Sequence, residues 1–510
     1  MTAQVDAAPQ QGRSKNGIPR WPKETFGADL GASLVVFLVA LPLCVGVAVA
    51  SGVPAELGII TGIVGGIVVG LLPGSTMQVS GPAAGLTVLV SSAVSQHGLG
   101  MLGVIVLGAG LLQIVMGLGG IGTWFRAISP SVVQGMLAGI GLVIMLGQLY
   151  PVGGLEQPSE TSAKFAGLPD LAVAMFTTPK GLAGLGVTVV TLVILFGWGK
   201  MPAKVRNIPA ALVAVVVVSA GTWALGLPLK MTEVGSLLSA INVPTGDAFA
   251  SALAPAVLGS MLTFALIASA ESLFSAAAVD RMHDGPRTQF NKELMAQGAG
   301  NAVCGVLGAL PMTAVIVRSG ANVRAGAKTK LSCVLHGVWL LLFVMALPGV
   351  LGFIPTAVLA ALLIQAGWKL LELNKVVEMV RTHRSEAAVL ILTAVMIVGT
   401  DLLIGTLIGL GAAVVKTAFE VSRLSVKEEE HGDDHVRVEL GGNATFLRLP
   451  RLLERLERLP ADKSVHLDLS TVRHLDQACH QAVQNWVAQR EKDNARTEVA
   501  MPEKVATASA

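Results

Sequence analysis

Long apolar runs alternate with short polar connections through most of the chain. A helix needs about 20 mainly apolar residues to cross a bilayer, and the runs approach that length, so they predict membrane-spanning helices. A polar stretch from Pro228 to Asp247 divides the runs into two sets of seven. The first set covers 31–50, 57–72, 82–95, 101–118, 131–149, 182–198 and 208–226. The second set covers 254–279, 294–309, 312–325, 332–347, 351–368, 387–400 and 402–420. This pattern predicts a polytopic α-helical membrane protein with 14 transmembrane segments in residues 26–423, built as two repeats at about 26–226 and 250–423.

The third and tenth runs are short, and each opens at a proline. Pro311 precedes only six apolar residues before Arg318, which is too few to span a bilayer. Non-helical backbone at membrane depth is tolerated where it lines an enclosed cavity, so we expect a half-helix that begins near Pro311 and faces a binding site. Its first amides favour an anion, and Arg318, two turns into the expected helix, adds paired N–H donors. The alternative is that Arg318 only marks the cytoplasmic end of a span.

The corresponding segment of the first half begins with Gly81 and Pro82. Gly81 permits close backbone approach, and the small residues Ala83 and Ala84 leave room at the amides of an opposing half-helix that continues through Gly85. A tight turn between two ordinary spans would use the same residues. Interrupted segments at corresponding places in two halves nevertheless indicate a transporter site.

Glu271 is the only acid within about 25 otherwise apolar residues, and an ionisable group in a membrane segment is a functional hypothesis by default. We expect a coupling role, in which Glu271 carries H⁺, or binds Na⁺ together with Ser275 and Thr313. The alternative is a strut that holds the two half-helices by hydrogen bonds.

Composition agrees with a membrane protein. The 510 residues have a mean hydropathy of +0.68, with 53% apolar and 14% charged residues, far from the charge content of a soluble domain. The net charge of +3 and the absence of a basic–aromatic cluster exclude nucleic-acid binding as the expected function. The four cysteines have no metal-ligand spacing, and no nucleotide-binding loop is present. We therefore expect no metal or other cofactor, and transport driven by an ion or exchange gradient.

Lysine and arginine collect in alternate loops, as the positive-inside rule requires of cytoplasmic loops. The expected outer connections carry only Lys164, Lys180 and Lys230. Residues 1–25 contain no signal peptide and are expected to be cytoplasmic, and an even number of spans returns the C-terminus to the cytoplasm. The expected inner loops carry Arg126, Lys200, Lys204, Arg206, Arg281, Arg287, Lys292, Arg324, Lys328, Lys330, Lys369, Lys375, Arg381 and Arg384.

The composition changes after Ser422, where we expect a solvated linker at 424–435. Alternating apolar residues predict two strands, around Val438 and Leu467, each followed by an amphipathic helix. Strands that alternate with helices predict a small α/β domain at 436–500. The chain from about Ala495 is expected to be disordered, including a tail at 501–510.

Three stretches carry a family resemblance: FLVALPLCVGVAVASG in the first run, QVSGPAAGLTV in the third and ALPMTAVIVRSGANVRAGAKTKLS in the tenth. Together they resemble the SulP (sulfate permease) family of anion transporters. The resemblance implies a seven-plus-seven inverted repeat with core and gate domains, a cytoplasmic STAS domain, a homodimer in the cell membrane and no enzymatic activity. It also implies that Glu271 is the coupling acid and that the anion lies among Ala83, Ala84, Gly85, Val315, Ile316, Val317 and Arg318.

The sequence departs from the family pattern at three places. Na⁺-coupled bicarbonate members have an Asp and a small residue at the positions of Glu271 and Arg318. Leu43 stands where prestin-like members have a polar Gln. The STAS-like region is reduced and has Asp476-Gln477 in place of Asp-Ser, so we expect no phosphorylation there. The transport half of bacterial carbonic anhydrase fusions is similar, which makes bicarbonate a natural cargo beside sulfate. The alternatives are a dicarboxylate or nucleobase permease of this architecture, and a membrane-anchored STAS signalling protein.

Overall fold

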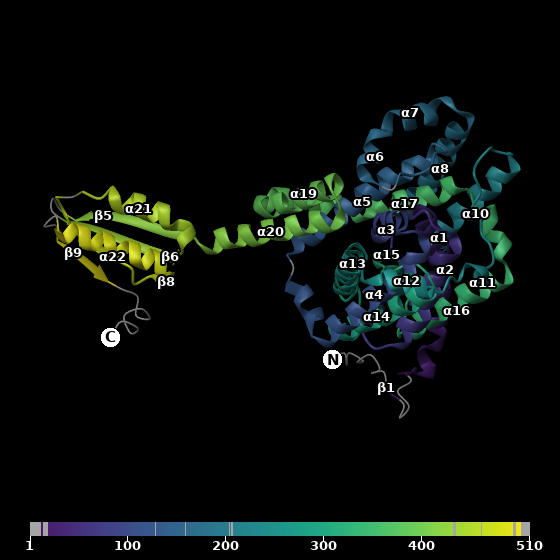
Figure 1. Cartoon of the computed structure of the whole chain (residues 1–510), viewed down its shortest axis with the longest axis horizontal. Coiled ribbons are helices and arrows are strands. Elements are labelled where there is room, and N and C mark those ends of the chain that lie inside the picture. Colours follow the sequence, from purple (N-terminus) through teal and green to yellow (C-terminus); the bar gives the residue numbers. More distant parts are fainter. Residues whose placement is uncertain are drawn as a thin grey trace. The chain divides into compact units, whose positions relative to one another are not determined.

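The computed structural model describes residues 12–13, 19–127, 129–158, 160–202, 205, 208–431, 435–460, 462–492 and 496–500. It consists of two compact units, Met1–Leu410 and Gly411–Ala510, whose helices and strands are labelled in Figure 1. Most of the expected cytoplasmic segment 1–25, the expected disordered tail 501–510, and Lys204 and Arg206 lie outside the described residues.

Each of the 14 predicted segments corresponds to a helix, or to a short strand followed by a helix. Seven helices of the described residues are long and apolar enough to cross a membrane on their own. The first half contains α1 (Phe26–Ala50), α2 (Ala55–Val64) with a π-helical continuation (Gly65–Val69), β3 (Ser80–Pro82) with α3 (Thr87–His97), α4 (Leu99–Leu118), α5 (Pro130–Val152), α8 (Pro179–Gly197) and α10 (Ala210–Ala224). The second half contains α13 (Pro255–Val279), α14 (Phe290–Val306), β4 (Met312–Ala314) with α15 (Ile316–Arg324), α16 (Leu331–Ala346), α17 (Thr356–Leu370), α19 (Arg384–Gly399) and α20 (Leu402–Val421).

Short elements connect these segments. They are not spans, because none of them is long enough to cross a bilayer. They comprise the strands β1 (Gly12–Arg13) and β2 (Pro19–Arg20) and the helices α6 (Thr161–Ala166), α7 (Leu168–Thr177), α11 (Leu237–Ala240), α12 (Gly246–Ala250) and α18 (Leu373–Thr382).

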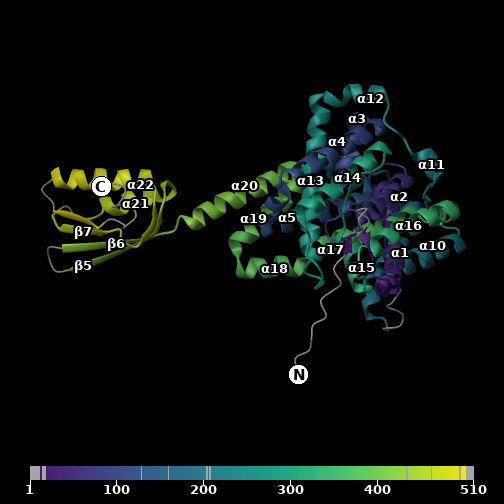
Figure 2. The same cartoon turned by 90° about the horizontal axis from the view of Figure 1, so that it is seen from below.

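The segments pack in two groups that follow their order in each half. In the first group, α4, α13 and α14 lie side by side in both views, and α1 packs against α2 and α16 (Figures 1 and 2). In the second group, α5 packs against α17 and α19, and α8 packs against α10 and α17. The first four segments of each half therefore form one bundle and the last three form another, which matches the expected core and gate domains.

The strands β3 and β4 lie side by side at the centre of the first bundle. They pair antiparallel, with Ser80 opposite Ala314, Gly81 opposite Thr313 and Pro82 opposite Met312. The prediction of a half-helix from Pro311 is therefore wrong, because Met312–Ala314 is extended and paired, and α15 begins only at Ile316.

Side chains from neighbouring helices satisfy the outer edges of this two-stranded sheet. The Met312 N–H donates to Asn301 Oδ1 (2.7 Å), and Asn301 Nδ2 donates to the Met312 carbonyl (3.1 Å). The Val79 N–H donates to Ser319 Oγ (2.9 Å), and the Val315 N–H donates to the Val79 carbonyl (3.0 Å). Extended backbone can persist in the centre of a membrane protein because its polar groups find such partners.

The second unit contains a sheet of five strands in the order β5-β6-β7-β9, with β8 paired to β6. β5 pairs antiparallel with β6, and the other pairs are parallel. The helices α21 and α22 pack against each other, and the core contains Leu440, Leu452, Leu467 and Val483. The elements are β5 (Leu424–His431), β6 (His435–Ala444), α21 (Leu449–Glu457), β7 (Ser464–Asp468), β8 (Val472–Leu475), α22 (Gln477–Lys492) and β9 (Thr497–Ala500).

Two expectations for this unit are wrong. The expected linker 424–435 contains strand β5, in which Leu424 and Val426 pack on the core and the charged run Lys427–Glu430 follows. The segment 497–500, expected to be disordered, is strand β9, which pairs with β7. The strand signals were missed because the charged run Lys427–Glu430 resembles a solvated loop, although a strand needs apolar residues on one face only.

Candidate functional site

Arg318 lies in the first turn of α15, not two turns into it as expected, because the helix begins at Ile316. Its side chain is only 1% exposed. Nη2 donates to the Pro82 carbonyl at 3.4 Å, whereas Nε and Nη1 have no hydrogen-bond partner among the described residues. A buried guanidinium with free donors is costly unless an anion accepts from it.

Gly81 makes room for this guanidinium. A Cβ at position 81 would lie 2.3 Å from Arg318 Nη1, closer than real Cβ contacts. Behind the guanidinium lie Cys44 of α1 and His336 of α16, both fully buried. Neither carries a negative charge that would neutralise Arg318 by itself.

Glu271 lies on α13 and faces the start of the opposing helix. A Cβ at Gly85 would lie 2.8 Å from Glu271 Oε1 and 3.0 Å from Oε2. The Thr313 side chain lies near the carboxylate, and Oε2 is buried without a partner among the described residues. Within the described part of the chain, no ion pair joins Glu271 to Arg318. Two ionisable groups of opposite sign thus border one small site without neutralising each other.

A cavity of about 60 Å³ lies between these groups. A buried water needs only about 10–15 Å³ on the same measure, so the space suits a few waters or one small anion. Of the predicted residues, Ala84, Gly85, Glu271, Ser275, Val315, Ile316, Val317 and Arg318 line it. Ala83 and Thr313 are buried beside it and do not appear in its lining.

Two helix N-termini meet at this cavity. Ala84 begins the short 3₁₀ turn Ala84–Leu86 that leads into α3, and Ile316 begins α15. The first N–H groups of a helix have no partner within the helix, and the helix dipole places partial positive charge there. With Arg318 in the first turn of α15, the site is built to attract negative charge.

Sequence reasoning missed most of the opposite wall of the cavity. This wall comes from the second bundle and from α1. Only Leu43 was singled out by the family resemblance; the other members are apolar side chains that resemble any core residue in sequence, so they gave no signal. The wall consists of Leu43, Val47, Leu137, Leu363, Ala366 and Leu370.

Comparison with known proteins identifies the architecture. The sequence model described as "Sulfate permease family" matches residues 26–393, which is most of the chain. The chain belongs to the sulfate permease family. A second match, described as "Mlab, STAS domain", covers residues 428–509 of this permease, in agreement with the α/β fold of the second unit.

Named relatives agree with this assignment. The permease is 29% identical over 365 residues to the putative sulfate transporter YvdB of Bacillus subtilis, covering 71% of this chain and 67% of that protein. It is 24% identical over 377 residues to the bicarbonate transporter BicA of Synechocystis, covering 71% of this chain and 65% of that protein. The matched region thus spans about two thirds of the length of these relatives.

Solved structures show the same fold. The transmembrane domain of a cyanobacterial bicarbonate transporter BicA superposes with a TM-score of 0.66 at 23% identity, covering 78% of this chain and 99% of that one. The murine anion transporter Slc26a9 in an inward-facing state gives a TM-score of 0.75 at 16% identity, covering 94% of this chain and 86% of that one.

Two charged residues of the permease, Asp29 and Lys330, hold the ends of its core helices. Asp29 Oδ1 accepts from the Lys328 N–H (2.7 Å) and the Thr329 N–H (2.9 Å), ahead of α16. Lys330 is 4% exposed, and its Nζ donates to the carbonyls of Val69 (3.3 Å) and Leu72 (2.5 Å). Lys330 therefore caps a helix C-terminus and is more than a surface charge that sets the orientation of the chain.

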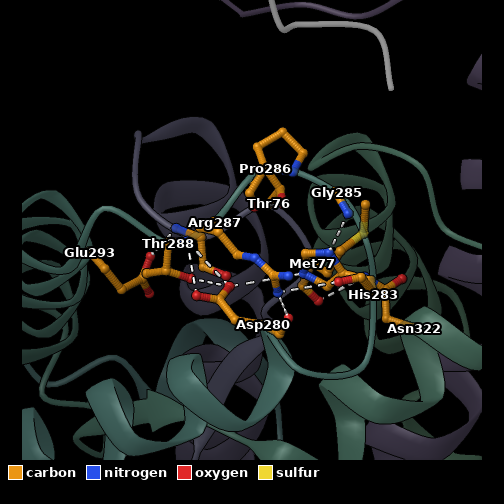
Figure 3. Close-up of polar contacts among 11 residues, drawn as sticks. Thr76, Met77, Asp280, His283, Gly285, Pro286, Arg287, Thr288, Glu293 and Asn322 are labelled. Atoms are coloured by element: carbon orange, nitrogen blue, oxygen red, sulfur yellow. Dashed lines mark hydrogen bonds and ion pairs between the residues drawn. The ribbon is translucent and has the colours of Figure 1, made fainter. Parts of the chain in front are cut away.

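Asp280 fixes the loop that follows the Glu271 helix (Figure 3). Its carboxylate accepts from the Thr288 N–H (3.2 and 3.1 Å) and the Thr288 hydroxyl (2.8 Å). Arg287 donates to the Asp280 carbonyl. Nearby, Asn322 Nδ2 donates to the Met77 carbonyl at 3.0 Å. The Asp280 contacts brace the loop between α13 and α14, and the Asn322 contact ties α15 to the segment that leads into β3.

Proposed function

We propose that this permease is a secondary transporter of a small inorganic anion, bicarbonate or sulfate, which works by alternating access. The observation that carries the proposal is Arg318, which is 1% exposed, lies in the first turn of α15 and has Nε and Nη1 donors without a partner in the described part of the chain. An anion in the adjoining cavity would accept from these donors and from the amides of two helix N-termini.

The cavity favours a small anion over larger cargo. Its volume of about 60 Å³ suits a single central atom with its oxygens. A nucleobase requires polar side chains to pair with the edges of its ring, and the wall opposite Arg318 is apolar, with Leu43, Val47 and Leu363 among its residues. The names of the relatives, a putative sulfate transporter and a bicarbonate transporter, also favour this class.

Glu271 is proposed as the coupling group. Its Oε2 is buried with no hydrogen-bond partner in the residues that the structure describes, and Ser275 and Thr313 lie beside the same site. A carboxylate with hydroxyl neighbours suits either proton transfer or Na⁺ binding. We further propose that the protein is a homodimer in the cell membrane with both termini in the cytoplasm, in accord with the distribution of basic residues.

The test is uptake of labelled bicarbonate and sulfate into liposomes that contain the purified full chain, with Na⁺ and pH gradients varied separately. Arg318→Ala removes a charge-assisted contact worth about 1.5–3 kcal/mol, so the affinity for the anion should fall about ten- to a hundredfold. Arg318→Lys should recover part of it, because a lysine keeps the charge and loses the planar donor pair.

Arg324→Ala is the matched control. Arg324 lies on the same helix and is exposed, so its removal changes the charge of α15 without touching the cavity, and uptake should stay near the wild-type level. Unchanged uptake by Arg318→Ala, at equal amounts of folded protein, would remove Arg318 from the anion site. Failure of the wild type to move either anion under any gradient would contradict the proposed class of substrate.

A further inference from the structure

A second and much larger cavity lies at one end of the transmembrane unit. Its volume is about 810 Å³, and it opens where α1 and α5 end and where α8 and α17 begin. The positive-inside pattern makes this the expected outer face. We refer to this cavity as the outer vestibule. Its lining includes Lys180 at the start of α8, Lys230 in the connection after α10, and Glu156 and Gln157 after α5.

The vestibule lies directly beyond the anion site. On α1, Val47 lines the small cavity, whereas Val49 and Ala50 line the vestibule. On α17, Leu363 lines the small cavity and Thr356 lines the vestibule, a separation of roughly 10 Å at 1.5 Å per residue. The helical residues between these positions are apolar and buried, for example Ala48 and Ala360. A thin apolar layer therefore separates the two spaces.

The basic residues of the outer side converge on this cavity. The expected outer connections have only three of them. Two line the vestibule, and the Nζ of the third, Lys164, lies 3.3 Å from the side-chain amide of Gln157. Acids outnumber bases in the same connections, yet among the described lining residues Glu156 is the only acid. The vestibule thus reverses the charge balance of its surroundings.

Helix stability does not account for the position of Lys180. It is the second residue of α8, and a cation in the first turn of a helix opposes the helix dipole. The side chain is exposed and faces the aqueous cavity. Its placement is explained if its charge serves a ligand there.

We propose that the outer vestibule is an anion-collecting site, in which Lys180 and Lys230 bind a small inorganic anion before it reaches Arg318. Low-dielectric walls focus the field of charges that line a cleft and raise the local concentration of counter-ions. The role in transport rests on the proposed function of the permease, whereas the capture of anions by the vestibule does not.

The first test measures the vestibule itself. Ser91 of α3 lines it and is half-buried, and all four native cysteines are buried, so Ser91→Cys supplies a reporter thiol. Membrane-impermeant methanethiosulfonates, one bearing a sulfonate and one a trimethylammonium group, are added outside. The thiolate attacks the reagent's sulfenyl sulfur, forms a mixed disulfide and expels methanesulfinate. The rate ratio of anionic to cationic reagent, normalised to a free thiol, reports the local charge.

Replacing both lysines, as Lys180→Gln with Lys230→Gln, should lower this ratio several-fold, and added salt should reduce the difference. Glu156→Gln should raise the ratio. Lys375→Gln, an exposed lysine of α18 paired with Glu372, is the matched control and should leave it unchanged. A ratio unaffected by the two lysine substitutions, or labelling only from the other face, would overturn the proposal.

The second test is anion uptake at low and high ionic strength. The double lysine variant should show a KM about two- to tenfold above that of wild type at low ionic strength, with an unchanged maximal rate. Lys180→Arg with Lys230→Arg keeps both charges and should behave like wild type, which separates loss of charge from misfolding. An equal KM for the Gln variant and a transporting wild type would end the role in uptake. If the wild type moves no anion, the proposed function fails, while the thiol ratio still decides the vestibule.

Discussion

Gly81→Ala should disturb anion transport by moving Arg318 alone. A Cβ at position 81 would lie 2.3 Å from Arg318 Nη1, and ordinary contact begins at 3.4 Å, so the guanidinium must shift by about 1.1 Å (3.4 − 2.3). The next atoms, Arg318 Cζ at 3.4 Å and Gly62 Cα at 3.7 Å, would be at ordinary van der Waals distance from the added methyl group. The backbone of Gly81 lies outside the left-handed region, so alanine can adopt it without strain. The whole steric load therefore falls on one flexible side chain.

The expected magnitude follows from this displacement. A shift of about 1 Å misaligns the donors and forfeits much of a charge-assisted contact worth about 1.5–3 kcal/mol. The KM for the anion should rise about tenfold or more. Overpacking should also lower the free energy of unfolding by about 1–3 kcal/mol. Both quantities are measurable, by initial rates of labelled anion uptake into liposomes and by thermal unfolding in detergent.

Gly46→Ala is the matched control for the added methyl group. On α1, a Cβ at Gly46 meets the side chains of Leu359 and Leu363 at 3.7 Å, an ordinary contact. This variant should transport like wild type and unfold no more easily, because alanine favours a helix over glycine.

A double-mutant cycle tests the mechanism. If Gly81→Ala acts through the guanidinium, its cost in unfolding free energy should fall to near zero in an Arg318→Ala background. Equal costs in both backgrounds would place the strain in the β3–β4 pair and refute the reasoning. An unchanged KM for Gly81→Ala would show that the position of Arg318 does not set anion affinity.

Two further predictions concern charged groups. Glu271→Gln keeps the shape of the side chain but can neither exchange a proton nor present a full charge to a cation. The ratio of uptake with and without the driving ion gradient should therefore fall to about one, while anion exchange continues. An unchanged ratio under both Na⁺ and H⁺ gradients, with a lower Tm, would make Glu271 a strut. Burial lowers the pKa of Lys164, in the connection between α5 and α8, from 10.5 to about 8. The unfolded chain therefore binds more protons between these values, and stability should rise with pH across that window by about 2–3 kcal/mol. Thermal unfolding from about pH 7 to 10 should show this rise in wild type and lose it in Lys164→Met; parallel curves for the two proteins would contradict the assignment.

The transmembrane segments were predictable because each depends on local composition. Fourteen apolar runs in two sets of seven correspond to the helical segments from α1 to α20, since a bilayer requires a continuous apolar stretch wherever the chain crosses it. The interruptions at Pro82 and Pro311 coincide with the paired strands β3 and β4, next to the small cavity. Arg318 and Glu271 could be singled out because a charge in an apolar run is costly and rare.

The conformation at the interruptions could not be read from the sequence. Met312–Ala314 is apolar and suits a helix, but it is extended because Ser80–Pro82, more than 200 residues away in the chain, offers backbone partners. The register of a strand pair depends on both strands, and local propensity reports only one. Because β4 ends at Ala314, α15 begins at Ile316, and Arg318 therefore lies in its first turn.

The sequence by itself determined the membrane class, the number and order of the segments and the α/β character of the C-terminal unit, and it singled out the two charged residues that line the small cavity. Only the tertiary structure decided which apolar side chains close the cavity opposite Arg318, that β5 joins the sheet, and that Lys180 and Lys230, from separate parts of the chain, line one vestibule. The reason is physical. Hydrophobicity acts on each residue according to its own side chain, whereas a cavity and its electric field arise from groups that lie close in space after distant segments pack.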